Sequence, residues 1–147
     1  ALSIQSFISK INNAVMANKQ FNVCAFSLAN IDITENKIEL IKSLIRQVNH
    51  LIHDNEYISL IHNDVIMCQL FRSRKEPSIF ASSILMSYNA YFSSEEPTVK
   101  PNAYGALYLP DINESAGVIL NNTLECLKES YIRHSMDDHF YLISDRM

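Results

Sequence analysis

Two apolar segments joined by a short polar turn constrain the fold more than any other part of the chain. The segments are residues 57–61 and 65–71, and the turn between them is His62-Asn63-Asp64. Segments of this length that meet across such a turn predict a β-hairpin, because Asn and Asp tolerate the positive φ angles of tight hairpin turns. The turn has no glycine to let a phosphate approach the backbone, and no carboxylate paired with Asp64.

Size and composition indicate one globular domain, which we take as residues 1–147, with 48% hydrophobic and 19% charged residues. The net charge of −4 argues against a nucleic-acid-binding surface, since phosphate contacts rely on clustered Lys and Arg. The short basic cluster Arg72-Ser73-Arg74-Lys75 is interpreted as a solvated strand-to-helix loop rather than a phosphate site. Gly105 and Gly117 are the only glycines, which excludes a Gly-rich phosphate loop.

The cysteines and the hydropathy pattern bear on the cellular compartment. Cys24, Cys68 and Cys126 are odd in number, widely spaced and embedded in apolar segments, as expected of reduced core residues in a cytosolic protein. No signal peptide opens the chain and no apolar run reaches membrane-spanning length. We therefore expect a cytoplasmic domain without membrane contact of its own, either free or as the cytoplasmic part of a membrane-anchored protein.

Periodicity and turn residues divide the rest of the chain into helices and strands. Apolar residues recur at helical spacing from Ser3 to about Asn18, within an entry segment that covers residues 1–20, and the apolar run from Phe21 to Ile31 predicts a central strand. The remaining predicted elements are a helix capped by Thr34 and ended by Asp54-Asn55, a helix that starts at Pro77 and is closed by Glu95-Glu96-Pro97, a strand at 103–109, a helix at 114–132 and a final strand, Phe140–Ile143.

This element order contains a β-α-β-β-α-β core. It predicts an α+β fold of the ferredoxin-like or palm type, in which an antiparallel-rich central sheet is flanked by helices, with an additional N-terminal helix and C-terminal strand. In this arrangement we expect the core helices to pack on one face of the sheet. The apolar face of the first helix can pack on this sheet or on a second copy of the chain, and periodicity alone does not distinguish the two.

Two groups of possible metal ligands stand out. His50 and His53 lie three residues apart on one helical face, with Asp54 adjacent and His62 in the following turn. We interpret the two histidines as exposed residues at a helix end, because such a pair without a third placed ligand is common by chance. The acidic stretch Asp137-Asp138-His139 is interpreted as a polar turn before the last strand.

A pair of aspartates is the remaining candidate for chemistry. A two-metal site for phosphoryl transfer needs carboxylates on adjacent strand ends. Asp32 follows the first strand and Asp64 lies in the hairpin turn, so both could lie at one edge of the sheet. Asn30 and Val65 stand where further ligands would be needed, so we interpret the aspartates as turn-capping residues. The spacing shows no Ser-His-Asp or Cys-His arrangement.

With these elements in place, the chain resembles a GGDEF domain, the diguanylate cyclase family, over nearly its whole length, and looks like a degenerate member. The strand end Asn30-Ile31-Asp32 is similar to the family's Asp-x-Asp, and His62-Asn63-Asp64-Val65-Ile66 occupies the place of its Gly-Gly-Asp-Glu-Phe turn. Further similarity covers the helix at 45–52, the strand Ala103-Tyr104-Gly105-Ala106-Leu107, which looks like Ser-Ile-Gly-Val-Ala, and the closing helix at 122–130.

The resemblance implies that the family's magnesium ligands are missing here. The first strand-end Asp and the turn Glu of the family correspond to Asn30 and Val65, which carry no charge. The two turn glycines that let GTP approach correspond to His62 and Asn63. Of the signature turn only Asp64 remains, so we expect no catalytic residues and no metal site.

What remains is at most a vestigial nucleotide-binding site formed by Asn30, Asp32 and Asp64. We expect no cofactor, and magnesium only with residual nucleotide binding. The family's inhibitory product site, Arg-x-x-Asp, corresponds to His53-Asp54-Asn55-Glu56. Its arginine is absent, which argues against cyclic di-GMP binding there, because a guanine or phosphate would lose a bidentate donor.

The resemblance therefore implies a catalytically inactive regulatory or dimerisation module of a bacterial cyclic di-GMP signalling protein, acting through protein–protein or interdomain contacts. Its partner would be an adjoining signalling domain such as EAL, or a second copy of the chain. The first is suggested because residues 140–147 resemble the junction to an EAL domain. Two alternatives stay open. A sensor for GTP or cyclic di-GMP requires that His62 and Asn63 leave a residual pocket, and an active divergent nucleotidyl cyclase requires a carboxylate pair.

Overall fold

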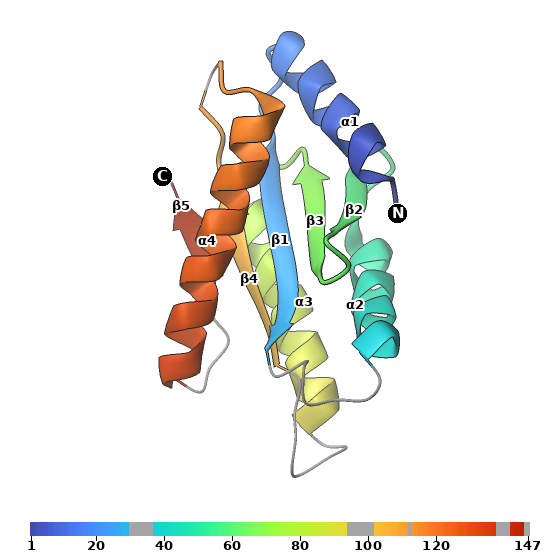
Figure 1. Cartoon of the computed structure of the whole chain (residues 1–147), viewed down its shortest axis with the longest axis vertical. Coiled ribbons are helices and arrows are strands. Elements are labelled where there is room, and N and C mark those ends of the chain that lie inside the picture. Colours follow the sequence, from blue (N-terminus) through green and yellow to red (C-terminus); the bar gives the residue numbers. More distant parts are fainter. Residues whose placement is uncertain (30–36, 94–101, 112, 138–141, 146–147) are drawn as a thin grey trace.

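The described strands form a single sheet with order β2-β3-β1-β4-β5, antiparallel except between β4 and β5 (Figure 1). This computed structural model describes residues 1–29, 37–93, 102–111, 113–137 and 142–145. The elements in chain order are α1 (Ile4–Met16), β1 (Asn22–Ala29), α2 (Lys37–Leu51), β2 (Tyr57–Ile61), β3 (Val65–Leu70), α3 (Glu76–Ser93), β4 (Asn102–Tyr108), α4 (Ala116–Asp137) and β5 (Leu142–Asp145). The predicted α+β fold and its element order are confirmed.

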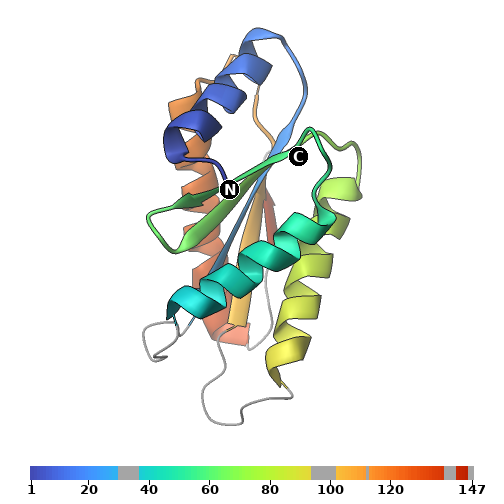
Figure 2. The ribbon, with the colours of Figure 1, turned by 90° about the vertical axis from the view of Figure 1, so that its right-hand side faces the viewer.

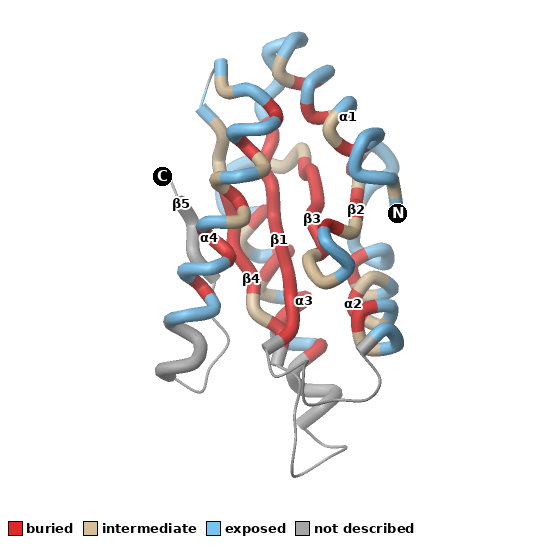
Figure 3. The backbone as a smooth tube through the Cα atoms, viewed as in Figure 1, coloured by how far each residue is buried: buried red, intermediate tan, exposed pale blue. Residues whose placement is uncertain are grey.

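The two core helices α2 and α3 pack on one face of the sheet, as expected, and α1 and α4 cover the other face (Figure 2). On β1, Cys24 and Phe26 pack with α2 and α3, whereas Val23 and Ala25 pack with α1 and α4. All four side chains are fully buried, and the buried strands run through the centre of the molecule in Figure 3. The apolar run of β1 is long enough to supply both faces because successive strand side chains alternate between them.

The apolar face of α1 packs on the sheet of its own chain. Phe7 and Ile11 are fully buried in the core beneath α1 and α4. Ser3 caps the helix, since its hydroxyl accepts a hydrogen bond from a first-turn amide. Before the cap, the hydroxyl of Ser59 on β2 donates to the carbonyl of Leu2 at 2.9 Å. These contacts hold α1 against the sheet of its own chain, a placement that periodicity alone did not distinguish from packing on a second copy.

The helix α2 differs from its predicted pattern in one position. Ile41, Leu44 and Val48 are buried against the sheet, whereas Ile38, expected on the same apolar face, is 69% exposed. Ile38 lies in the first turn of the helix, one turn before the stretch that packs. Within the described residues, no helix has both the length and the hydropathy needed to cross a membrane.

Some predicted positions lie outside the described residues. They are Thr34, the loop Glu95-Glu96-Pro97 and residues 140–141, which begin the last predicted strand. The described part of that strand, β5, continues to Asp145, two residues beyond its predicted end. Strand β5 pairs with β4 in parallel because α4 forms the crossover between them.

The cysteines are core residues, as predicted. Cys24 and Cys68 lie opposite each other in the β1–β3 pairing, and Cys126 lies on α4. All three are buried, and none of them forms a disulfide within the described part of the chain. Burial raises the pKa of the Cys24 and Cys68 thiols, so both stay protonated at neutral pH.

Gly105 marks a very close approach between β4 and the core. A Cβ atom at this position would lie 3.0 Å from the carbonyl oxygen of Ala25 and 3.0 Å from a ring carbon of Phe26. Gly105 pairs with Phe26 across β1 and β4, so the ring covers the place where a side chain would project. In contrast, a Cβ atom at Gly117 in the first turn of α4 would meet no atom within 4 Å.

Replacing Gly105 with Ala should lower the free energy of unfolding by about 1–3 kcal/mol, because the added methyl group meets a backbone carbonyl that cannot move away. The matched substitution Gly117→Ala should instead raise it by up to about 1 kcal/mol, since it only improves helix propensity. Urea unfolding followed by circular dichroism measures both. Equal effects of the two substitutions would contradict this role of Gly105.

Candidate functional site

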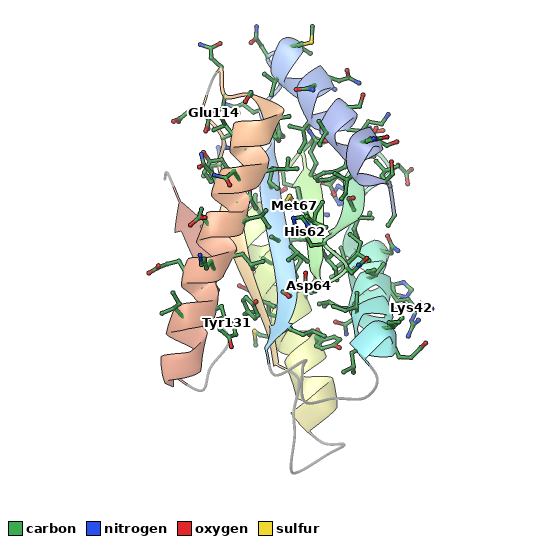
Figure 4. The ribbon with its side chains drawn as sticks, in the orientation of Figure 1. Lys42, His62, Asp64, Met67, Glu114 and Tyr131 are labelled. Atoms are coloured by element: carbon green, nitrogen blue, oxygen red, sulfur yellow. The ribbon has the colours of Figure 1, made fainter. Side chains whose placement is uncertain are left out.

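The turn between β2 and β3 has the backbone geometry that glycine usually provides. His62 and Asn63 have φ angles of 54° and 67°, and the amide of Asp64 donates to the carbonyl of Ile61 at 3.3 Å. Two consecutive residues with positive φ make a tight hairpin turn, for which glycine is favoured. The side chains of His62 and Asn63 are exposed (Figure 4). The turn therefore keeps a glycine-like backbone while carrying two side chains.

A polar cluster, which we call the turn cluster, fastens this turn to the sheet. It consists of Ser27, Asp64, Tyr104 and Tyr131. The Ser27 hydroxyl donates to the main-chain carbonyl of Asp64 at 2.7 Å, and Ser27 lies opposite Tyr104 in the β1–β4 pairing. The rings of Tyr104 and Tyr131 have centroids 5.1 Å apart. Burial raises the pKa of Tyr104, although a hydrogen bond with Ser27 opposes this effect. The Tyr104 hydroxyl therefore stays protonated at neutral pH, and the Ser27 hydroxyl holds the turn to β1.

The structure places only part of the predicted nucleotide site. Asp64 is half-buried at the turn, and Val65 is half-buried and packs against the core beneath α1 and α4. Asn30 and Asp32 lie outside the described residues, so their distance to Asp64 is not given. Strand β1 runs alongside this turn, because Phe26 pairs with Ile66. The placement of Asp32 and Asp64 at one edge of the sheet stays a prediction.

The histidines do not converge with the turn. His50 is in the last turn of α2 and His53 follows the helix, both exposed, whereas His62 lies at the far end of β2. A strand of five residues separates His53 from His62 by roughly 17 Å. Within the described ranges, no group of three or more His, Cys, Asp or Glu side chains is placed to hold a metal ion. Asp138 and His139 lie outside those ranges.

A buried ion pair that the sequence reasoning missed joins the open ends of the hairpin. Arg72 donates to Glu56 through Nε at 3.0 Å and through Nη2 at 2.9 Å. The Glu56 carboxylate also accepts the amides of His53 at 2.8 Å and Phe71 at 2.9 Å. The Glu56 side chain is 2% exposed and that of Arg72 is 11% exposed. A usable signal existed, since an acid just before one strand and an arginine just after the next are neighbours in an antiparallel hairpin.

The same arginine ties the hairpin to two helices. Its Nη2 donates to the carbonyl of Leu51 at the end of α2, at 2.7 Å, and its guanidinium lies 4.4 Å from the ring centroid of Phe80 on α3. The interpretation of the basic cluster as a solvated loop is therefore wrong for Arg72. Arg74 and Lys75 are exposed, as expected of residues in a loop.

Glu56 is also the last residue of the segment 53–56, for which the sequence suggested comparison with an inhibitory site. Burial alone would raise the pKa of Glu56, but the hydrogen bonds from Arg72 and from the amides of His53 and Phe71 outweigh it and lower the pKa below its usual value. The four hydrogen bonds occupy both carboxylate oxygens. This carboxylate therefore serves the fold rather than an incoming ligand.

Replacing Glu56 with Gln should lower the free energy of unfolding at pH 7 by about 3 kcal/mol, because it leaves a buried guanidinium without its counter-charge. The lowered pKa means that the wild-type contribution is complete above the ordinary value of 4.5 and is lost as the pH falls below it. The variant should therefore lose less stability than the wild type between pH 5 and pH 3, in a range of about two pH units. Denaturant unfolding across this range measures the effect.

The control is Glu39→Gln, which removes an acid that lies 3.9 Å from Lys42 in an exposed pair. This change should alter the free energy of unfolding by no more than about 0.5 kcal/mol at any pH. If Glu56→Gln behaved in the same way, the ion pair would not hold the hairpin ends together.

Substitutions of Asn63 test the turn geometry. Asn63→Gly should leave the free energy of unfolding unchanged or raise it by up to about 1 kcal/mol, since glycine adopts positive φ without steric cost. Asn63→Val should lower it by more than about 1 kcal/mol, because a β-branched residue is strained in this region. Thermal unfolding distinguishes the two, and equal stability of both variants would contradict the left-handed geometry.

Comparisons with known proteins agree with this architecture. No protein-family model matches the sequence, and no curated protein sequence matches it either. Among solved structures, the GGDEF domain of DgcB from Caulobacter crescentus, in complex with c-di-GMP, superposes with a TM-score of 0.75 at 6% identity, covering 97% of this chain and 90% of that one. The active GGEEF domain of a diguanylate cyclase from Vibrio cholerae gives 0.69 at 10% identity, covering 97% and 94%.

A third structure, an EAL/GGDEF domain protein from M. capsulatus, has a TM-score of 0.60 at 10% identity and covers 95% of this chain and 97% of its own. At such low identities the likeness lies in the fold. Over nearly its whole length, this chain has the fold of a GGDEF domain.

Proposed function

We propose that this chain is one GGDEF-like domain that makes no cyclic dinucleotide and acts as a regulatory module in a cyclic di-GMP signalling protein. The observation that carries the proposal is the composition of the β2–β3 turn, where Asp64 is followed by Val65, which packs into the core. Phosphoryl transfer from a nucleoside triphosphate needs magnesium held by converging oxygen ligands. A valine that packs into the core offers no such oxygen.

The two residues before Asp64 support the same proposal. His62 and Asn63 hold the positive φ angles of a glycine turn but add side chains on the surface that a triphosphate would approach. A phosphate that binds backbone amides needs close access to them, which is why glycines are common at such turns. The vestigial site proposed for Asn30, Asp32 and Asp64 would therefore hold a nucleotide weakly at best.

The ion pair between Glu56 and Arg72 also supports a domain that binds no cyclic di-GMP at residues 53–56. A guanine there would have to compete with Arg72 and two backbone amides for this carboxylate, and a phosphate would have to compete with the carboxylate for Arg72. Breaking a buried ion pair is costly, because the remaining charge stays buried without a partner. Regulation by cyclic di-GMP at residues 53–56 is therefore not part of the proposed function.

The output would pass through contacts with an adjoining signalling domain, such as an EAL domain, or through a second copy of the chain. A neighbour of similar fold, from M. capsulatus, is itself an EAL/GGDEF domain protein. Both ends of the described chain are tied to the sheet, by Leu2 on β2 and by the parallel pairing of β5 with β4. A rigid body held at both ends can pass on a rotation between neighbouring domains without chemistry.

A calorimetric titration with GTP and magnesium tests the proposal, together with chromatography for cyclic di-GMP after incubation. We expect no saturable heat up to about 1 mM GTP, a range in which even weak specific binding is measurable, and no product. The Asp64→Asn variant should give the same traces. A combined variant that carries Asn30→Asp, His62→Gly, Asn63→Gly and Val65→Glu should gain magnesium-dependent GTP binding, because it restores the missing oxygens and the open turn.

The remaining outcomes point to the alternatives. Saturable heat that disappears in the Asp64→Asn variant would identify a nucleotide sensor in place of a purely structural module. Cyclic di-GMP formed by the wild type and lost in that variant would identify an active cyclase, and would overturn the proposal.

A further inference from the structure

A groove of ≈ 690 Å³ lies at the end of the molecule opposite the β2–β3 turn. Three connections meet there: the one from α1 into β1, the one from β3 into α3 and the one from β4 into α4 (Figure 1). The groove is separated from the turn by most of β1, since Asn22 at the groove lies five residues, about 17 Å, from Ser27, which bonds to the turn. Its volume is in the range typical of small-molecule sites, about 300–1,000 Å³.

The groove gathers positive charge in a chain whose net charge is −4. Lys19, Arg72 and Arg74 line it, and Asp111 supplies one opposing charge. The charge of Arg72 is already matched by Glu56, which leaves Lys19 and Arg74 to face the groove. The Lys19 ammonium lies 5.5 Å from the ring centroid of Phe71, a residue that lines a neighbouring groove to which Lys19 also contributes.

A buried amide in the wall of the groove lacks a partner. Asn22 is 8% exposed, and within the described part of the chain no donor reaches its side-chain oxygen. Buried polar atoms are nearly always hydrogen-bonded, because the alternative is the full cost of desolvation. A ligand with an O–H or N–H group next to Asn22 would satisfy this oxygen.

All three connections hold a non-glycine residue in the left-handed region. Asn18, Arg74 and Asn113 have φ angles of 55°, 57° and 78°. Such residues persist where the surrounding structure determines the backbone, and they cluster at ligand sites. One wall is held further by Glu114, which accepts the amide of Asp111 at 2.6 Å and the hydroxyl of Tyr108 at 2.7 Å (Figure 4). The walls of the groove are therefore formed before any ligand arrives.

From the lining, the volume and the unpartnered amide together, we infer that this groove binds a small phosphate ester, either a nucleotide or a sugar phosphate. Lys19 and the guanidinium of Arg74 bind the phosphate group, since planar guanidinium groups and ammonium groups both recognise phosphate oxygens. The oxygen of Asn22 accepts a hydroxyl or amino group from the rest of the ligand. Phe21 and Leu109 provide an apolar surface for a sugar or base.

The site is distinct from the β2–β3 turn, and it does not depend on the function proposed above. It would give the domain a small-molecule input on the side where α1 enters the sheet. Occupation of the groove would bridge the connection after α1 and the loops after β3 and β4. A ligand there can therefore alter how firmly the entry helix is held against the sheet.

Titration of the isotope-labelled chain with adenosine monophosphate, glucose 6-phosphate or inorganic phosphate tests this by NMR. We expect saturable shifts at the amides of Asn18, Asn22, Arg74 and Asn113, with a dissociation constant below about 1 mM for at least one ester. Inorganic phosphate should bind about tenfold more weakly, because it supplies no sugar or base to the apolar wall. The tighter ester identifies the source, a nucleotide or a sugar phosphate.

Variants separate a built site from general charge attraction. Lys19→Gln and Arg74→Gly should each weaken ester binding about tenfold, since each removes a charge-assisted hydrogen bond. Glycine suits the φ angle of 57° at position 74, so this change does not strain the loop. The control Lys42→Gln removes the same charge from the exposed surface of α2, a helix that contributes no described residue to the lining of the groove, and should leave affinity unchanged.

Asn22→Leu gives an independent readout, because it removes the unpartnered oxygen while keeping the side-chain size. It should weaken binding of the preferred ester and leave binding of inorganic phosphate unchanged. The absence of saturable shifts at about 10 mM ester would overturn the inference, and so would shifts confined to the Asp64 turn. Equal affinity for inorganic phosphate and the esters would also overturn it. The same holds if Lys42→Gln weakened ester binding as much as Lys19→Gln and Arg74→Gly.

Discussion

The burial of β1 on both faces is the constraint on which the rest of the structure depends. Its side chains alternate between the core under α2 and α3 and the core under α1 and α4, and its backbone pairs with β3 and β4. A strand in this position fixes what lies at its two ends. The β2–β3 turn sits beside the end at Ala29, and the groove sits at the end that begins with Asn22. Both candidate sites are thus products of one strand and its neighbours.

Two acids of this protein serve the fold. Glu56, which is buried, holds the ends of the hairpin to α2 and α3 through Arg72, and Glu114, which is half-buried, holds the β4–α4 connection through Tyr108 and Asn122. A carboxylate that is largely removed from water persists only where donors satisfy its oxygens, and in both cases the donors come from the chain itself. Carboxylates committed in this way are not available for metal or phosphate chemistry.

Hydrophobic periodicity predicted the order of elements well, because each long apolar run is stable in only one kind of secondary structure. Periodicity predicted less about which faces of the sheet the helices cover. The alternation along β1 was read as burial on at least one side, and only packing with α1 and α4 shows that both sides are covered. Arg72 was misread for a related reason. A charged residue in a short basic stretch looks solvated until the register of β2 and β3 brings it against Glu56.

The amino-acid sequence by itself determined the α+β class, the hairpin, and the identity of the turn residues, including Asn63 and Val65, because these depend on local apolar pattern and on residue type. Only the tertiary structure decided the partner of Glu56, the close approach at Gly105 and the groove around Asn22, since each brings together segments far apart in the chain. The physical reason is that hydrogen bonding and close packing depend on distances in space, whereas periodicity records only which face of an element is apolar.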